Sequence, residues 1–172
     1  MLTAVPHQMM LLFFPAVMAM AAAMDLLTMK IPNRLSAALA IGYFAAALLT
    51  RAPPHDVAMH ALCGAAMLVF TFSLFSFGWI GGGDAKLAAA TALWLGWTPL
   101  AEYGLTSALA GGALTLLILT GRRMALPEAL ASQVWIARLH NAKSGIPYGI
   151  ALAFGGMLVY PETQLWGLLA VR

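Results

Sequence analysis

The sequence has little charge. Its 172 residues include nine Lys and Arg and six Asp and Glu, so that 9% are charged, while 62% are hydrophobic. A typical soluble domain has about 25% charged residues, and a chain of this length still exposes roughly 30% of its surface after folding. This composition excludes a soluble domain and makes lipid the expected solvent for most of the chain. Nothing in it indicates nucleic-acid binding.

Cysteine is nearly absent as well. Cys63 is the single cysteine, which excludes an internal disulfide and a zinc site built from four cysteines. His60 precedes it by three residues and would share its helical face, but no second pair of ligands is evident. We therefore expect a packed interior pair there, and no metal site.

Six stretches without Lys, Arg, Asp or Glu are present, and such stretches indicate membrane spans because charge is costly at the bilayer centre. They predict an all-α, polytopic membrane protein with about six transmembrane helices. The fourth, 87–101, is short: its helix would reach about 22 Å across a core of about 30 Å. The six stretches are 1–24, 35–50, 57–83, 87–101, 103–121 and 144–161.

The polar segment 122–143 separates the last two stretches. Pro127 suits the first position of a helix, and Leu130, Val134 and Leu139 form a rough apolar stripe. This pattern predicts an interfacial helix on the cytoplasmic face, with a simple connector as the alternative.

The basic residues are distributed unequally between the two sides of the predicted membrane. The positive-inside rule places the richer side in the cytoplasm and both termini outside. Trp79, Trp94 and Trp97 lie near span ends, which suits either an aromatic belt or ordinary packing. The richer side carries Lys30, Arg34, Lys86, Arg122, Arg123, Arg138 and Lys143, and the other side Arg51 and Arg172.

Two acids, Asp25 and Asp84, fall at the predicted cytoplasmic edge, and acids within membrane segments are candidates for function. Three glycines, 81–83, precede Asp84 and permit a backbone shaped around its carboxylate. If the helices bring both carboxylates together and they share a proton, one can activate water while the other polarises a carbonyl. The alternative is structural: Asp25 pairs with Lys30, and Asp84 pairs with Lys86 or caps a helix.

Three motifs resemble those of the type IV prepilin peptidase family, which consists of GxGD-type membrane aspartic proteases. An aspartate near the end of the first span is followed by Ile-Pro-Asn, a GxGDxK signature comes next, and a weaker match opens the last span. The residues are Asp25 with Ile31, Pro32 and Asn33; Gly81, Gly83, Asp84 and Lys86; and Pro147, Tyr148 and Gly149.

The resemblance implies that Asp25 and Asp84 are the catalytic pair of one transmembrane peptidase domain spanning 1–172. It implies cleavage of prepilin leaders at the cytoplasmic face of the bacterial inner membrane, without a cofactor. The family's larger members carry an insertion with paired CxxC motifs and methylate the new N-terminus; this sequence has no such insertion. Its compact form resembles the small enzymes of tight-adherence (Flp-type) pilus systems, whose substrates are pilins and pseudopilins with one apolar helix.

Other functions stay open from the sequence. A small proton- or cation-coupled carrier would use the same acids, and a noncatalytic pilus assembly factor would need neither. Besides membrane lipid, a second copy of the chain is a candidate partner. The glycine spacings 78–82 and 145–149 suit close helix contact within one chain or between two.

Overall fold

The computed structural model describes residues 4–170 and contains helices and no strand within that range. The predicted all-α membrane fold is confirmed: four helices are long and apolar enough to cross a bilayer. They are α1 (Ala4–Thr28), α2 (Asn33–Thr50), α3 (Pro54–Ser76) and α5 (Leu100–Gly121). The remaining elements are α4 (Gly82–Leu95), α6 (Glu128–Ala131), α7 (Val134–His140), α8 (Gly149–Val159), η1 (Tyr160–Glu162) and α9 (Gln164–Ala170).

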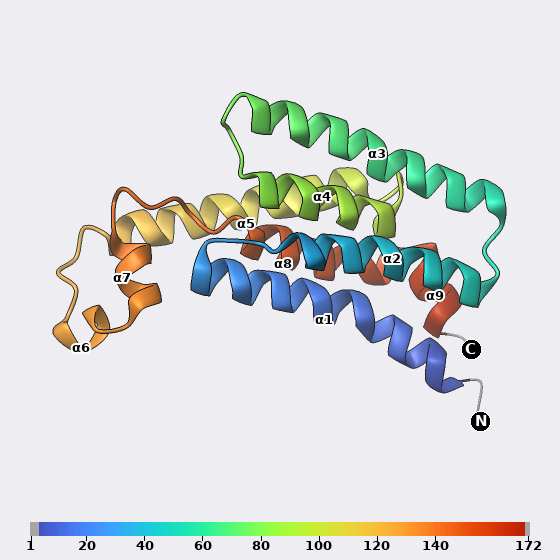
Figure 1. The fold of residues 1–172 in the computed structure, drawn as a ribbon, viewed down its shortest axis with the longest axis horizontal. Helices are drawn as coiled ribbons and strands as arrows, with labels where there is room; N and C mark the ends of the chain where they lie inside the picture. The colour runs from blue at the N-terminus through green and yellow to red at the C-terminus, as the bar shows by residue number, and fades with distance from the viewer. Residues whose placement is uncertain (1–3, 171–172) are drawn as a thin grey trace.

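The two remaining charge-free stretches form shorter helices. Helix α4 has 14 residues, or about 21 Å of length, and α8 continues into η1 as an apolar segment over Gly149–Glu162. In Figure 1, α4 lies between α3 and α2. It is buried on nearly every side from Ala85 to Leu95, so protein rather than lipid surrounds most of its surface.

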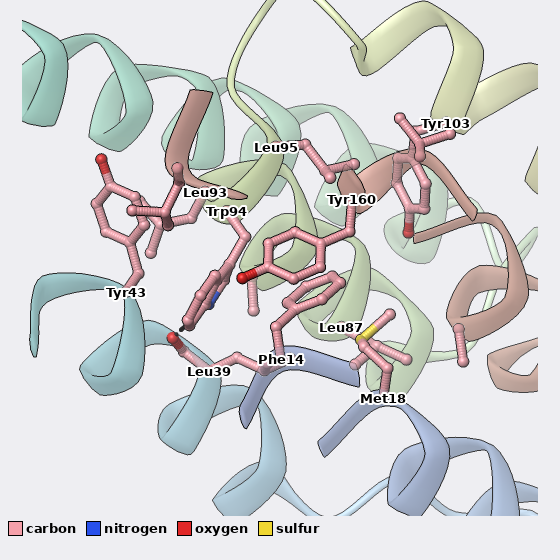
Figure 2. Close-up of a cluster of buried hydrophobic side chains, with 14 of the residues drawn as sticks. Phe14, Met18, Leu39, Tyr43, Leu87, Leu93, Trp94, Leu95, Tyr103 and Tyr160 are labelled. Carbon is pink, nitrogen blue, oxygen red and sulfur yellow. Dashed lines mark hydrogen bonds between the residues drawn. The ribbon is translucent and has the colours of Figure 1, made fainter. Parts of the chain in front are cut away.

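The core is centred on Trp94 of α4, whose side chain is fully buried. Its indole Nε1 donates a 2.8 Å hydrogen bond to the Leu39 carbonyl of α2, and its ring contacts Phe14, Tyr43 and Tyr160 (Figure 2). Of the two roles open to this tryptophan, packing is the one observed. The contacts join α1, α2, α4 and η1 around one side chain. They hold α4 at one position along the axis of the bundle.

The loops between α1 and α2, between α3 and α4, and between α5 and α8 lie at one end of the helices (Figure 1). These loops and their flanks carry the seven basic residues of the predicted cytoplasmic side, whereas Arg51 lies in the α2–α3 loop at the other end. Arg172 lies outside the described residues. The charge asymmetry of the sequence therefore corresponds to two ends of the helical bundle.

Helix is present within 122–143 as expected, but it is divided. Two short helices, α6 and α7, are present, and Gln133 between them is extended, with φ −84° and ψ 113°. The Ser132 hydroxyl donates to the Ala129 carbonyl at 2.8 Å, a local bond that competes with continuation of a helix. Leu130 therefore does not share one continuous stripe with Val134.

Candidate functional site

Asp25 lies in the last turn of α1, where the carboxylate is buried with 5% of the residue exposed. The helix ends because Met29 adopts a left-handed conformation, with φ 56°, while its amide still donates to the Asp25 carbonyl at 2.7 Å. The backbone N–H of Gly149, at the start of α8, donates a 2.7 Å hydrogen bond to Asp25 Oδ2. The beginning of α8 therefore positions an acid that is 124 residues away in sequence.

At position 149, any residue larger than glycine would displace Asp25 or Ile31. A Cβ atom there would lie 2.8 Å from Asp25 Oδ2 and 2.7 Å from Ile31 Cδ1, distances that real Cβ atoms do not adopt. The third motif noted in the sequence therefore contacts the first motif directly.

Asp84 is the third residue of α4, and its carboxylate lies near the N-terminal end of the helix dipole. A Cβ atom on Gly81 would be 2.9 Å from Asp84 Oδ2, so this glycine permits the chain to turn closely over the acid. Asp84 lies outside the four long spans. Burial, and then the negative charge of Asp25, raise the pKa of Asp84 to about 6, whereas a hydrogen bond with the Gly81 backbone acts in the opposite direction.

The two aspartates share one cavity. It has a volume of about 330 Å³ and is lined by Asp25, the turn 29–31, the glycines 81–83 and Asp84. The structure thus brings together Asp25, Ile31, Gly81, Gly83 and Asp84 from the first two motifs. The cavity offers two carboxylates and a wall of three glycines without side chains, which leaves room for a short extended peptide.

The alternative in which each aspartate pairs with a nearby lysine is not observed. Within residues 4–170, the ion pair present is His55 with Asp56, which lies at the start of α3. Lys86 Nζ instead donates a 3.0 Å hydrogen bond to Asn33 Oδ1. This bond connects the first motif to the second, because Asn33 begins α2 and Lys86 lies in the second turn of α4.

The remaining motif residues lie around the cavity without lining it. Pro32 is extended and precedes the first residue of α2, and Pro147 is fully buried. The Tyr148 hydroxyl is 3.0 Å from Thr115 Oγ1 of α5. These residues hold the elements that carry the acids.

Two of the basic residues, Arg122 and Arg138, form backbone contacts that the sequence did not predict. Arg138 Nη1 of α7 donates to the Leu27 carbonyl, close to Asp25, at 2.8 Å. Arg122 donates from Nε to the Leu139 carbonyl at 2.7 Å and from Nη2 to the carbonyls of Ser144 and Gly145 at 3.0 and 3.1 Å. Their partners are backbone carbonyls up to 111 residues away, which no residue pattern identifies.

Candidate metal ligands do not gather at this cavity. In the part of the chain that the structure describes, no group of three or more His, Cys, Asp or Glu is placed to hold a metal ion. His60 forms a 2.9 Å hydrogen bond with the Leu93 carbonyl, and Cys63 is fully buried. Both side chains are packed within the protein.

Comparison with known proteins gives one family. The model of the type IV leader peptidase family matches residues 12–116, more than half of the chain, and this range includes both aspartates. No curated protein and no solved structure matches the chain. The match agrees with the resemblance carried by the sequence motifs, and the chain belongs to the type IV leader peptidase family.

Proposed function

We propose that the protein is a membrane aspartic endopeptidase that removes the leader peptide of type IV prepilins, or of Flp-type pilins and pseudopilins. The observation that carries this proposal is the cavity shared by Asp25 and Asp84. Membership of the leader peptidase family supports a hydrolase, and the cavity supplies the pair of carboxyl groups that aspartic peptidases use.

The chemistry uses one proton held between two acids. Asp84, whose pKa is raised to about 6, holds the proton and donates a hydrogen bond to the scissile carbonyl. Asp25 accepts a proton from a water molecule, whose oxygen bonds to the carbonyl carbon to form a tetrahedral intermediate. The C–N bond then breaks, the departing amine takes a proton from Asp25, and the two acids recover their starting states.

Charge and length support a choice of substrate and of membrane face. The basic loops gather at the end of the bundle that holds the aspartates, and by the positive-inside rule this supports a cavity at the cytoplasmic face. A small pilin with a short leader before one apolar helix would present its leader junction at that interface. Because the chain lacks the CxxC insertion, we expect the cleaved pilin to have an unmethylated N-terminus. We expect the enzyme itself in the inner membrane of a bacterium.

A proton- or cation-coupled carrier is the competing function. Carriers place their ionisable groups near the bilayer midplane, within broken helices. Asp25 and Asp84 instead lie at one end of their helices, which favours hydrolysis of a peptide at the interface.

The test is cleavage of a coexpressed, tagged Flp-type prepilin, followed by mass spectrometry of its N-terminus. Asp25→Asn and Asp84→Asn should each abolish the new N-terminus, while the proteins still insert in the membrane. Asp56→Asn is the matched control, since Asp56 lies in the first turn of α3 and outside the cavity. Cleavage that persists in either cavity variant would contradict the two-aspartate mechanism, and proton uptake without any cleavage would favour the carrier.

A further inference from the structure

An open groove runs between α2 and α3, with α4 as its floor. Its first part has a volume of about 550 Å³. Helix α2 contributes Ala37 and Ala40 to one wall, and α3 contributes Ala61 and Ala65 to the other. These positions are three or four residues apart, so each helix presents a single face to the groove.

The groove extends along the full length of α2. A second hollow of about 620 Å³ lies between the same two helices toward Arg51, and Phe44 and Ala61 line both hollows. Helix α2 has 18 residues, or about 27 Å, which is close to the thickness of the hydrocarbon core. The groove therefore has the length of a membrane-spanning helix.

Small residues make the groove deep. Gly64 of α3 packs closely on α4, since a Cβ atom there would lie 3.1 Å from Leu93 Cβ and 3.3 Å from the Ala89 carbonyl oxygen. Alanines face each other across the middle of the groove, where Ala37 and Ala65 are both exposed, while Phe44 and Leu68 are the large side chains on the two walls. In lipid, two apolar helices gain little free energy from leaving the solvent, so close packing has to stabilise their association. Small side chains allow a second helix to approach closely enough for such packing.

One end of the groove adjoins the aspartate cavity. Asn33 and Lys86 line the groove at that end. Ile31 and Asp84, each two residues earlier in the chain, line the cavity. The hydrogen bond between Lys86 and Asn33 thus lies at the boundary between an apolar groove and a pair of acids.

We propose that this groove holds the apolar helix of the substrate, oriented so that the residues preceding that helix enter the aspartate cavity. The inference rests on the proposed function and adds where the substrate binds. Its occupant must be helical, because a chain in lipid has to satisfy its backbone hydrogen bonds internally. It must also be apolar over one membrane thickness, because the groove is polar at its two ends and apolar between them. A peptide with one apolar helix and a polar leader meets both conditions.

Photocrosslinking tests the location directly. A benzophenone amino acid is introduced at Ala65, in the groove, or at Leu116, which is 68% exposed on α5, and each protein is coexpressed with the tagged Flp-type prepilin. We expect a prepilin adduct from position 65 and little from position 116. Equal adducts from both positions, or lipid adducts alone from position 65, would overturn the groove assignment.

Filling the groove tests its role in cleavage. Ala37→Trp and Ala65→Trp should each lower the cleavage rate at subsaturating prepilin by at least about tenfold. Ala66→Trp is the matched control, because Ala66 is exposed on the same helix and does not line the groove. Thermal unfolding of the purified proteins shows whether each variant folds, and the crosslinking result does not depend on these substitutions.

The two proposals fail in different ways. Cleavage by the unmodified protein without a groove adduct would overturn the groove alone. Absence of any new N-terminus from the unmodified protein would overturn the proposed function, and with it the role of the groove.

Discussion

The backbone amide of Gly149 lies 2.7 Å from Asp25 Oδ2 and donates a hydrogen bond to it. This contact predicts that Gly149→Ala lowers the cleavage rate by about 100-fold, since displacing a reacting group by about 1 Å can have an effect of that size. The added methyl group would occupy space held by the Asp25 carboxylate and by Ile31 Cδ1. The measurement is the rate of leader removal in proteoliposomes.

Gly112→Ala is the control for this prediction. Gly112 is also a helical glycine, but a Cβ atom there would contact nothing within 4 Å, so its cleavage rate should match that of the unmodified protein. Equal rates for the two alanine variants would show that the Gly149 contact does not position Asp25 for catalysis.

The pKa of Asp84 predicts how cleavage depends on pH. Burial and the nearby Asp25 raise this pKa to about 6, so the proton that polarises the scissile carbonyl is present below pH 6 and is lost as the pH rises through that value. We expect kcat/KM to fall above pH 6 and to approach a tenfold decrease for each further pH unit. The profile is measured between pH 5 and 8 with the prepilin held in vesicles, and a flat profile over this range would contradict the assignment of the acid.

The sequence predicted the two acids, their shared end of the bundle and the helical fold, because apolar stretches and charge-bearing loops are local features. It did not predict that Gly149 contacts Asp25, since that contact depends on how α8 packs against α1. The division of 122–143 into α6 and α7 was missed for a different reason: an apolar stripe of three residues does not reveal the local bond from the Ser132 hydroxyl to the Ala129 carbonyl, which competes with helix continuation. Packing of Trp94 was one of two interpretations that its position near the end of a predicted span left open.

The Lys86–Asn33 hydrogen bond predicts coupling between the first two motifs. Lys86→Met and Asn33→Ala each remove one partner of a 3.0 Å contact, so each should slow cleavage severalfold by loosening the position of α4 against α2. Because both remove the same contact, the double variant should be no slower than the slower single variant, which a double-mutant cycle of cleavage rates measures. Multiplicative effects of the two substitutions would show that the residues act independently.

The Arg122 side chain holds the segment between α5 and α8 in place. Its guanidinium donates to three backbone carbonyls, those of Leu139, Ser144 and Gly145, and this segment leads directly to Gly149. Arg122→Ala should release it, so that trypsin cuts after Arg138 and Lys143 severalfold faster, because proteolysis follows the population of locally opened chain. Cleavage of prepilin should also slow, since the start of α8 holds Asp25.

Arg123→Ala is the matched control for the Arg122→Ala prediction. Arg123 is adjacent, equally charged and exposed, and its side chain forms no hydrogen bond or ion pair within residues 4–170. Its variant should therefore keep the tryptic pattern after Arg138 and Lys143 and the prepilin cleavage rate of the unmodified protein. If both arginine variants open the segment to the same extent, the positive charge of the loop rather than the three carbonyl contacts keeps it closed.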